Sequence, residues 1–152
     1  MRTVLTLLAA SAALAAADPA GFVLWKGAEL KSYEKKLAPK IDAHKVATES
    51  LGNFGNHNFM VAHREGSGQA ELHEKQADLF IVQSGEGTLV VGGTVVDAKT
   101  TEPNEIRGPS IKDGVNKHLG PGDVVHIPAK TPHQLMVESG KQITYAVMKV
   151  NE

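Results

Sequence analysis

The sequence predicts a single all-β domain, a sandwich or barrel of about seven short strands. From residue 56 onwards, apolar and polar side chains alternate with the period of two that is typical of half-buried strands. The chain has 15 glycines and 7 prolines, many of which separate the alternating segments as turn residues do. Its 152 residues suffice for one domain with its own core.

The first 17 residues have the composition of a secretory signal peptide. Arg2 precedes an apolar run at residues 4–17, which is rich in Leu and Ala and is too short to span a bilayer. Ala15-Ala16-Ala17 satisfies the small-residue rule for cleavage, and Asp18-Pro19 follows as a break. A buried Ala-rich helix is the alternative. The signal peptide predicts that the protein is secreted or periplasmic.

Residues 18–55 are expected to form an N-terminal arm that contains a short helix. Within the segment 28–37, Leu30, Tyr33 and Leu37 recur at helical spacing, and Pro39 ends the pattern. This apolar stripe must cover either the outside of the barrel or a partner subunit, so a homodimer is one expectation. Trp25 is expected to anchor the arm.

The strands of the barrel are expected within residues 56–152. The alternating segments are 56–64, 69–73, 78–82, 88–96, 122–127, 133–137 and 142–150. Gly92-Gly93 interrupts the fourth segment and indicates a hairpin. Residues 98–117 are polar and lack a clear strand pattern, so they form a flap over a pocket mouth, a surface loop or an extra edge hairpin.

The composition excludes several classes of function. A net charge of −1 and an aromatic content of 5% argue against a nucleic-acid partner. The chain has no cysteine, so thiolate metal ligands and cysteine nucleophiles are excluded. It also lacks a phosphate-binding P-loop and a serine nucleophile elbow. We therefore expect a small-molecule partner and, after signal cleavage, no membrane association.

Ionisable side chains recur at positions that face the predicted barrel interior. Glu71 and His73 share a strand face because side chains two apart point the same way. Asp78 starts the next strand after a four-residue turn, so a hairpin can fold it back beside His73. Pro132 stiffens the approach to His133. Ionisable groups inside a barrel are costly unless they are paired or bind a metal, which indicates a site.

The first of these segments resembles a motif of the cupin superfamily, Gly-x5-His-x-His-x3,4-Glu-x6-Gly. Aligning Gly85 with the last glycine of the motif places Asp78 where the family has Glu. His73 then occupies the position of the second His, and Glu71 that of the first His. This motif is degenerate here.

The second segment resembles the other cupin motif, Gly-x5-Pro-x-Gly-x2-His-x3-Asn, more specifically. Gly122, Pro128 and His133 match it, whereas Lys130 replaces the middle Gly and Val137 replaces the closing Asn. The resemblance covers residues 56–150, about two-thirds of the chain.

The resemblance implies a double-stranded β-helix, or jelly-roll, barrel with a metal site. It implies His73, Asp78, His133 and Glu71 as ligands of a divalent transition metal such as Fe, Mn, Zn or Ni. Glu71 is either a ligand or the general base. Alternatively, Asp78 is a carboxylate that caps the turn, and Glu71 is a solvent-facing residue.

Three functions remain open from the sequence. The first is an exported metal-dependent enzyme, a dioxygenase with Fe or an isomerase or epimerase with Mn or Zn, in which Glu71 or a residue that contacts the metal ligands moves the proton. The second is a non-catalytic barrel that binds a small ligand such as a sugar, with a structural metal or none. The third is a structural envelope protein that dimerises through its arm.

Overall fold

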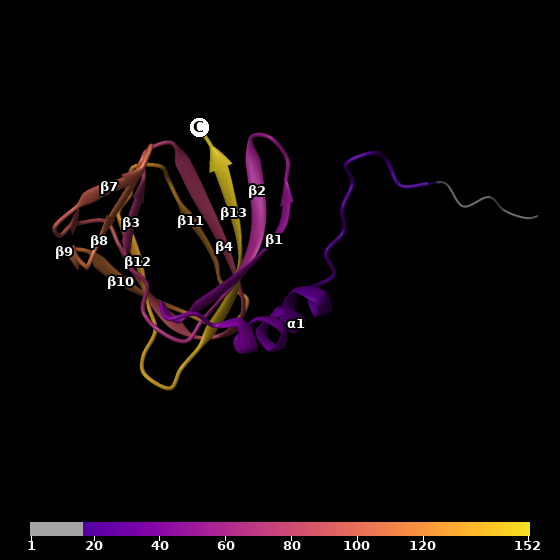
Figure 1. Cartoon of the computed structure of the whole chain (residues 1–152), viewed down its shortest axis with the longest axis horizontal. Coiled ribbons are helices and arrows are strands. Elements are labelled where there is room, and N and C mark those ends of the chain that lie inside the picture. Colours follow the sequence, from indigo (N-terminus) through magenta and orange to yellow (C-terminus); the bar gives the residue numbers. More distant parts are fainter. Residues whose placement is uncertain (1–16) are drawn as a thin grey trace, which may run out of the picture.

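A barrel of two antiparallel sheets, with one helix on its outside, makes up the computed structural model, which describes residues 17–152 (Figure 1). The predicted signal peptide, apart from Ala17, lies outside the described residues. In the part of the chain that is described, no helix is both long and apolar enough to cross a membrane.

The helices and strands follow in this order: α1 (Gly27–Leu37), η1 (Ala38–Lys40), β1 (Val46–Asn53), β2 (His57–Arg64), β3 (Ala70–His73), β4 (Gln76–Gly85), β5 (Gly87–Val91), β6 (Thr94–Val95), β7 (Lys99–Glu102), β8 (Glu105–Gly108), β9 (Ile111–Lys112), β10 (Val115–Leu119), β11 (Val124–Ile127), β12 (His133–Met136) and β13 (Ile143–Asn151). Each strand segment that the alternation predicted overlaps at least one of these strands.

Two large sheets enclose the core, and strands from distant parts of the chain neighbour one another in both. One sheet has the order β1-β2-β13-β4-β11, and the other has the order β10-β5-β12-β3-β8-β7. A two-stranded sheet, β6-β9, lies beside them, and the pairings of the described strands are antiparallel. The predicted fold class, a jelly-roll barrel with a short helical arm, is confirmed.

The core fills the space between the two sheets. Its large buried side chains come from both sheets: Phe80, Val82, Leu89, Ile127, Leu135, Ile143, Tyr145 and Val147. Burying a large apolar side chain contributes about 1.5–3 kcal/mol. This core occupies one part of the barrel, and the ionisable side chains occupy another part.

The helix α1 packs against the outer face of the five-stranded sheet. Its buried residues Tyr33 and Leu37 contact a second apolar cluster that includes Phe59 and Val61 of β2. The Trp25 ring lies 4.7 Å from that of Phe59, centroid to centroid, and anchors the arm as expected. The apolar stripe of the helix therefore covers the barrel of its own chain.

Part of the segment that we assigned to the arm joins the sheet. Val46–Asn53 forms β1, an edge strand that pairs with β2 along most of its length. Its Val46 and Thr48 line the cavity of the barrel. The arm that lies outside the sheet thus ends before residue 46.

The segment 98–117 forms strands rather than an irregular flap. β7 and β8 make an antiparallel hairpin at the edge of the six-stranded sheet, which agrees with the edge-hairpin alternative. β8 also pairs with β3, so that Glu105 lies opposite His73 and Arg107 lies opposite Glu71. The hairpin therefore brings two charged side chains to the predicted ligands.

The expectation that β3 and β4 form a hairpin is wrong. β3 belongs to the six-stranded sheet and β4 to the five-stranded sheet, so the chain crosses from one sheet to the other between His73 and Gln76. Asp78 consequently approaches His73 from the opposite wall of the barrel. The sequence correctly predicted that the two side chains are close, but not that they come from strands of two facing sheets.

Candidate metal centre

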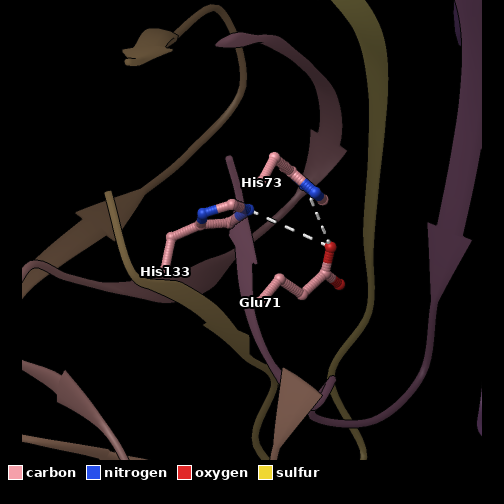
Figure 2. Close-up of side chains that lie close together, drawn as sticks. All are labelled: Glu71, His73 and His133. Carbon is pink, nitrogen blue, oxygen red and sulfur yellow. Dashed lines mark ion pairs between the residues drawn. The ribbon is translucent and has the colours of Figure 1, made fainter. Parts of the chain in front are cut away.

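The four predicted site residues converge inside the barrel. Glu71 and His73 come from β3, His133 comes from β12, which pairs with β3 at Glu71, and Asp78 comes from β4 on the facing sheet. Glu71 Oε2 lies 3.5 Å from His73 Nε2 and 4.0 Å from His133 Nε2. Both imidazole rings thus direct a nitrogen toward one carboxylate oxygen (Figure 2).

Asp78 is buried and lies next to both rings. Its Oδ2 is 3.3 Å from His73 Nε2 and 3.6 Å from His133 Nε2. Burial alone would raise the pKa of Asp78, but the neighbouring His133 and His73 rings and the charge of Lys149 hold that pKa well below its usual range. Asp78 is therefore a carboxylate at neutral pH, as a ligand or a counter-ion must be.

The Nδ1 atom of each imidazole, which points away from the shared carboxylate oxygen of Glu71, has a partner of its own. His133 Nδ1 lies 3.0 Å from the carbonyl oxygen of Thr131, and His73 Nδ1 contacts the Glu105 carboxylate. A carbonyl can only accept, so His133 carries its proton on Nδ1 in the neutral form and leaves the Nε2 lone pair free. Such contacts orient histidine ligands in metal sites.

The environment of His73 favours positive charge at this point of the barrel. Burial alone would lower the pKa of His73, but hydrogen bonds to Asp78 and Glu105 outweigh it and raise the pKa to about 9. A metal ion or a proton can supply the positive charge that these carboxylates stabilise. Metal binding at His73 would therefore release a proton at neutral pH.

Lys149 is a site residue that the sequence analysis missed. Its Nζ lies 3.0 Å from both oxygens of Asp78 and 2.9 Å from His73 Nε2. The register of β13 and β4 places Lys149 opposite Asp78. The signal was present, because Tyr145, Val147 and Lys149 alternate on one face of a predicted strand.

Arg107 and Glu105 were also missed, because nothing in the polar segment 98–117 marked them. Arg107 Nη1 lies 2.8 Å from Glu71 Oε1, and Nη2 pairs with Glu105. The same Glu105 contacts His73 Nδ1. Arg107 thus occupies one oxygen of Glu71, and the other oxygen faces the two imidazole rings.

These contacts decide which residues fit a metal ion. One ligand atom each from Glu71, His73 and His133 lies within 4.8 Å of the others. Two neutral imidazoles and one carboxylate are a donor set that divalent transition metals accept. Asp78 fits less well, because Lys149 already neutralises both of its oxygens. The donor chemistry therefore fits a two-histidine, one-glutamate site with Asp78 beside it.

A cavity of about 240 Å³ adjoins this group inside the barrel. Its polar wall includes Glu71, Asp78 and His133, together with the cations Arg64, Arg107 and Lys149. Its apolar wall includes Met60, Phe80, Leu135 and Val147. A small molecule in this cavity would contact the candidate ligands and an apolar surface at the same time.

Two other histidines and Gln134 lie outside the candidate ligand set. His63 is buried, and its Nδ1 lies 2.8 Å from the hydroxyl oxygen of Thr144, so it is a hydrogen-bonded core residue. His126 is exposed on the edge strand β11. Gln134 turns away from the ligands and donates to the carbonyl oxygens of Gly68 and Pro109.

No protein-family model and no curated protein match the sequence. Solved structures match the fold. The crystal structure of the DMSP lyase DddQ from Ruegeria pomeroyi superposes with a TM-score of 0.52 at 16% identity, over 71% of this chain and 48% of that chain. This chain therefore spans about half the length of the lyase.

Two further structures carry the name of the fold. A protein with a double-stranded β-helix domain from Klebsiella pneumoniae gives a TM-score of 0.54 at 15% identity, over 72% of this chain and 80% of that chain. A cupin-2 domain from Rhodospirillum rubrum gives 0.52 at 18% identity, over 72% and 62% of the two chains. At these identities the similarity establishes the cupin fold and leaves the chemistry to the site.

Proposed function

We propose that this protein is a metal-dependent cupin that catalyses acid–base chemistry on a small molecule bound in the barrel cavity. The observation that carries the proposal is the convergence of ligand atoms of Glu71, His73 and His133 within 4.8 Å of one another, with Glu71 and His133 lining that cavity. The proposed ligands are these three residues, with Asp78 as an adjacent carboxylate. When bound, a divalent ion would supply a Lewis acid for a carbonyl or enolate oxygen.

Glu71 is better suited to be a ligand than the general base. Its Oε1 is held by the Arg107 guanidinium, so this oxygen is not free to take a proton from a substrate. Its Oε2 faces both imidazole nitrogens. Of the two roles that the sequence left open, we therefore propose the ligand.

Lys149 is the proposed acid–base residue. Its ammonium group is bound by Asp78, borders the cavity and has 21% of its side chain exposed. It can therefore hold a proton at Nζ and transfer it to a substrate atom in the cavity. Arg107 and Arg64 would orient the substrate, and the apolar wall would exclude water from the other side.

Metal analysis tests this proposal directly. Protein purified without added metal is expected to contain close to one equivalent of Fe, Mn, Zn or Ni by mass spectrometry, and His73→Ala and His133→Ala are each expected to lose it. His126→Ala is the matched control, because this histidine is exposed and outside the site. Full retention of metal in His133→Ala would refute the ligand set.

A non-catalytic binding barrel is the second candidate, and one contact favours it. Lys149 Nζ lies 2.9 Å from His73 Nε2, so the lysine can satisfy the polar groups of the cavity without an ion. Under this alternative, reconstitution would yield no bound metal, and a ligand would bind equally well with and without a chelator.

Export and oligomeric state complete the proposal. We propose that the chain is secreted or periplasmic after removal of residues 1–17, which the composition of that segment supports. Mass spectrometry of the mature protein should give an N-terminus at Asp18. The homodimer stays a prediction that no longer has the support of the α1 stripe, because that stripe packs on the barrel of its own chain. Light scattering of the mature protein would test it.

A further inference from the structure

We infer that the molecule bound by this cavity is a small organic acid, whose carboxylate is held by Arg64 at a basic mouth. That this molecule is a substrate rests on the proposed function. That it is an organic acid rests on three separate observations: the donors of Arg64, the charges around the mouth and the apolar wall of the cavity.

Arg64 lines the cavity, and most of its hydrogen-bond donors have no partner within the described residues. Its Nε donates to the Tyr145 hydroxyl oxygen at 3.1 Å, and its Nη2 lies 3.9 Å from Glu71, beyond hydrogen-bond distance. Within residues 17–152, no other hydrogen bond of this guanidinium is found. Only 13% of the side chain is exposed, and a guanidinium has five N–H donors. No Arg64 nitrogen is among the described buried side-chain atoms that lack a partner, so the four unused donors are open to water or to an anion that enters the cavity.

The position of the guanidinium is fixed by its surroundings. A Cβ atom added at Gly68 would lie 3.0 Å from Arg64 Nη1, so the guanidinium packs directly against this glycine. The carbonyl oxygen of Gly68 accepts a hydrogen bond from the Gln134 side chain at 2.9 Å, and the backbone N–H of Gly68 donates to the carbonyl oxygen of Leu135. The loop that backs Arg64 is thus tied to β12, the strand that carries His133.

The mouth of the cavity is basic. A second hollow of about 440 Å³ is lined by Lys45, Arg64, Arg107 and His44, and none of the described residues that line it is Asp or Glu. Val46, Arg64 and Arg107 line both this hollow and the cavity beside the candidate metal ligands. An anion in the mouth would therefore reach Arg64 before it reached the ligands.

The charges inside the barrel lead to the same class of ligand. Three carboxylates and three cations surround the centre: Glu71, Asp78, Glu105, Arg64, Arg107 and Lys149. Their formal charges cancel, so a divalent ion would leave the centre positive. A carboxylate that binds with the ion would reduce this excess, which is unfavourable in a partly buried site.

The remaining wall of the cavity defines the rest of the molecule. Met60, Phe80, Leu135 and Val147 present an apolar surface opposite the charged groups. The volume of about 240 Å³ lies below the range of about 300–1,000 Å³ that is typical of sites for drug-sized ligands. A short aliphatic body with one carboxylate suits both the size and the polarity. The planar fork of Arg64 also matches a carboxylate in shape.

Pentanoate and pentanamide form a matched probe pair for this inference, because they differ in charge and hardly in size. Binding would be measured by ligand-observed NMR titration of the full mature chain, as purified and after chelator treatment. Pentanoate is expected to bind at least about tenfold more tightly than pentanamide in both preparations. Inorganic phosphate is the third probe and is expected to compete more weakly than pentanoate.

Arg64→Gln is expected to abolish the preference for pentanoate over pentanamide, and Lys45→Gln to reduce it by about two- to threefold. Lys141→Gln removes an exposed lysine outside the mouth and should leave the preference unchanged. If Arg64→Gln does not fold, as judged by circular dichroism, Gly68→Ala is the second variant. It keeps Arg64 and its charge but pushes the guanidinium away from its present position. Gly68→Ala is then expected to weaken pentanoate binding while pentanamide binding is retained.

Equal affinity for the two probes, or an unchanged preference in Arg64→Gln, would overturn the inference. Tighter binding of phosphate than of pentanoate would overturn the carboxylate class. These results can be distinguished from the outcome of the metal analysis. Stoichiometric metal without a carboxylate preference would refute this inference alone. An Arg64-dependent preference in a protein that never binds metal would support it and refute the proposed metal dependence.

Discussion

Lys149 Nζ lies 2.9 Å from His73 Nε2, so an ammonium group borders the nitrogen that the metal ion is proposed to bind. The same ammonium bridges both oxygens of Asp78 at 3.0 Å. Lys149 therefore opposes metal binding through its charge and removes one carboxylate from the possible ligands. Its replacement should change metal affinity in a direction opposite to that of a ligand mutation.

We predict that Lys149→Met binds the metal about tenfold more tightly than the wild type. Removing a cation next to the site eliminates its repulsion of a divalent ion, and it frees Asp78 to contribute its charge. Competition with a calibrated chelator would measure the change, with Lys141→Met as the control for loss of an exposed lysine. Weaker metal binding by Lys149→Met would show that the lysine supports the site.

The same variant is expected to be less stable when the metal is removed. Asp78 has 2% of its side chain exposed, so loss of Lys149 leaves a buried carboxylate with His73 as its remaining cationic neighbour. Breaking a buried ion pair typically costs about 3–5 kcal/mol, and the partial exposure of Lys149 favours the lower value. Urea unfolding in the presence of chelator should show this loss, and saturating metal should restore part of it.

Glu71 and Asp78 are predicted to differ in their importance for metal binding. Glu71→Gln should weaken metal binding by about a hundredfold, because Glu71 Oε2 faces both imidazoles. Asp78→Asn should weaken it by less than about tenfold, because Lys149 already holds that carboxylate. Isothermal titration with Zn or Mn would compare the two isosteric changes. The reverse order would make Asp78 the ligand and Glu71 the counter-ion of Arg107.

Glu105 is predicted to position the His73 ring. Glu105→Gln removes the charge that faces Nδ1, and such outer partners typically change metal affinity by about 10–100-fold. The ¹⁵N chemical shifts of His73 would report a changed tautomer population, which a purely structural role would not produce. Glu102→Gln is the matched control, because Glu102 is exposed on the same hairpin. Unaltered His73 shifts in Glu105→Gln would contradict the positioning role.

The strands and the first candidate ligands could be predicted because both depend on local sequence. Period-two alternation predicted the segments that form the barrel, and the spacing of Glu71 and His73 placed them on one face of β3. The second motif-like segment correctly placed His133 near them. Local patterns of this kind define which way a side chain points within its strand.

The rest of the site could not be predicted, because it depends on which strands are neighbours. Glu105 faces His73 because β8 pairs with β3, and Lys149 faces Asp78 because β13 pairs with β4. Alternation gives no information about pairing partners that lie up to about seventy positions apart. The same limit explains the mistaken hairpin between β3 and β4, whose short connection is equally compatible with a crossing between sheets.

Tyr145 provides a prediction about alkaline pH. Burial raises the pKa of its phenol above the usual value of about 10, and this effect outweighs the opposing effect of the Arg64 cation. The unfolded chain therefore releases the phenolic proton at a lower pH than the folded protein does. The contribution of this group to stability is full below about pH 10 and is lost as the pH rises through the higher folded pKa.

Tyr145→Phe should remove that pH dependence. At neutral pH the variant is expected to be about 1–2 kcal/mol less stable than the wild type, because Arg64 Nε loses its acceptor. Above about pH 10 the wild-type free energy of unfolding should fall more steeply, by up to about 1.4 kcal/mol per pH unit, so the two curves should converge. Urea unfolding from about pH 7 to 11 measures both curves, and lysine titration cancels in their difference.

The control Tyr33→Phe keeps Tyr145 and should keep the steep decline. Parallel curves for the wild type and Tyr145→Phe would mean that the phenol ionises equally well in the folded protein, and that Arg64 rather than burial governs its pKa.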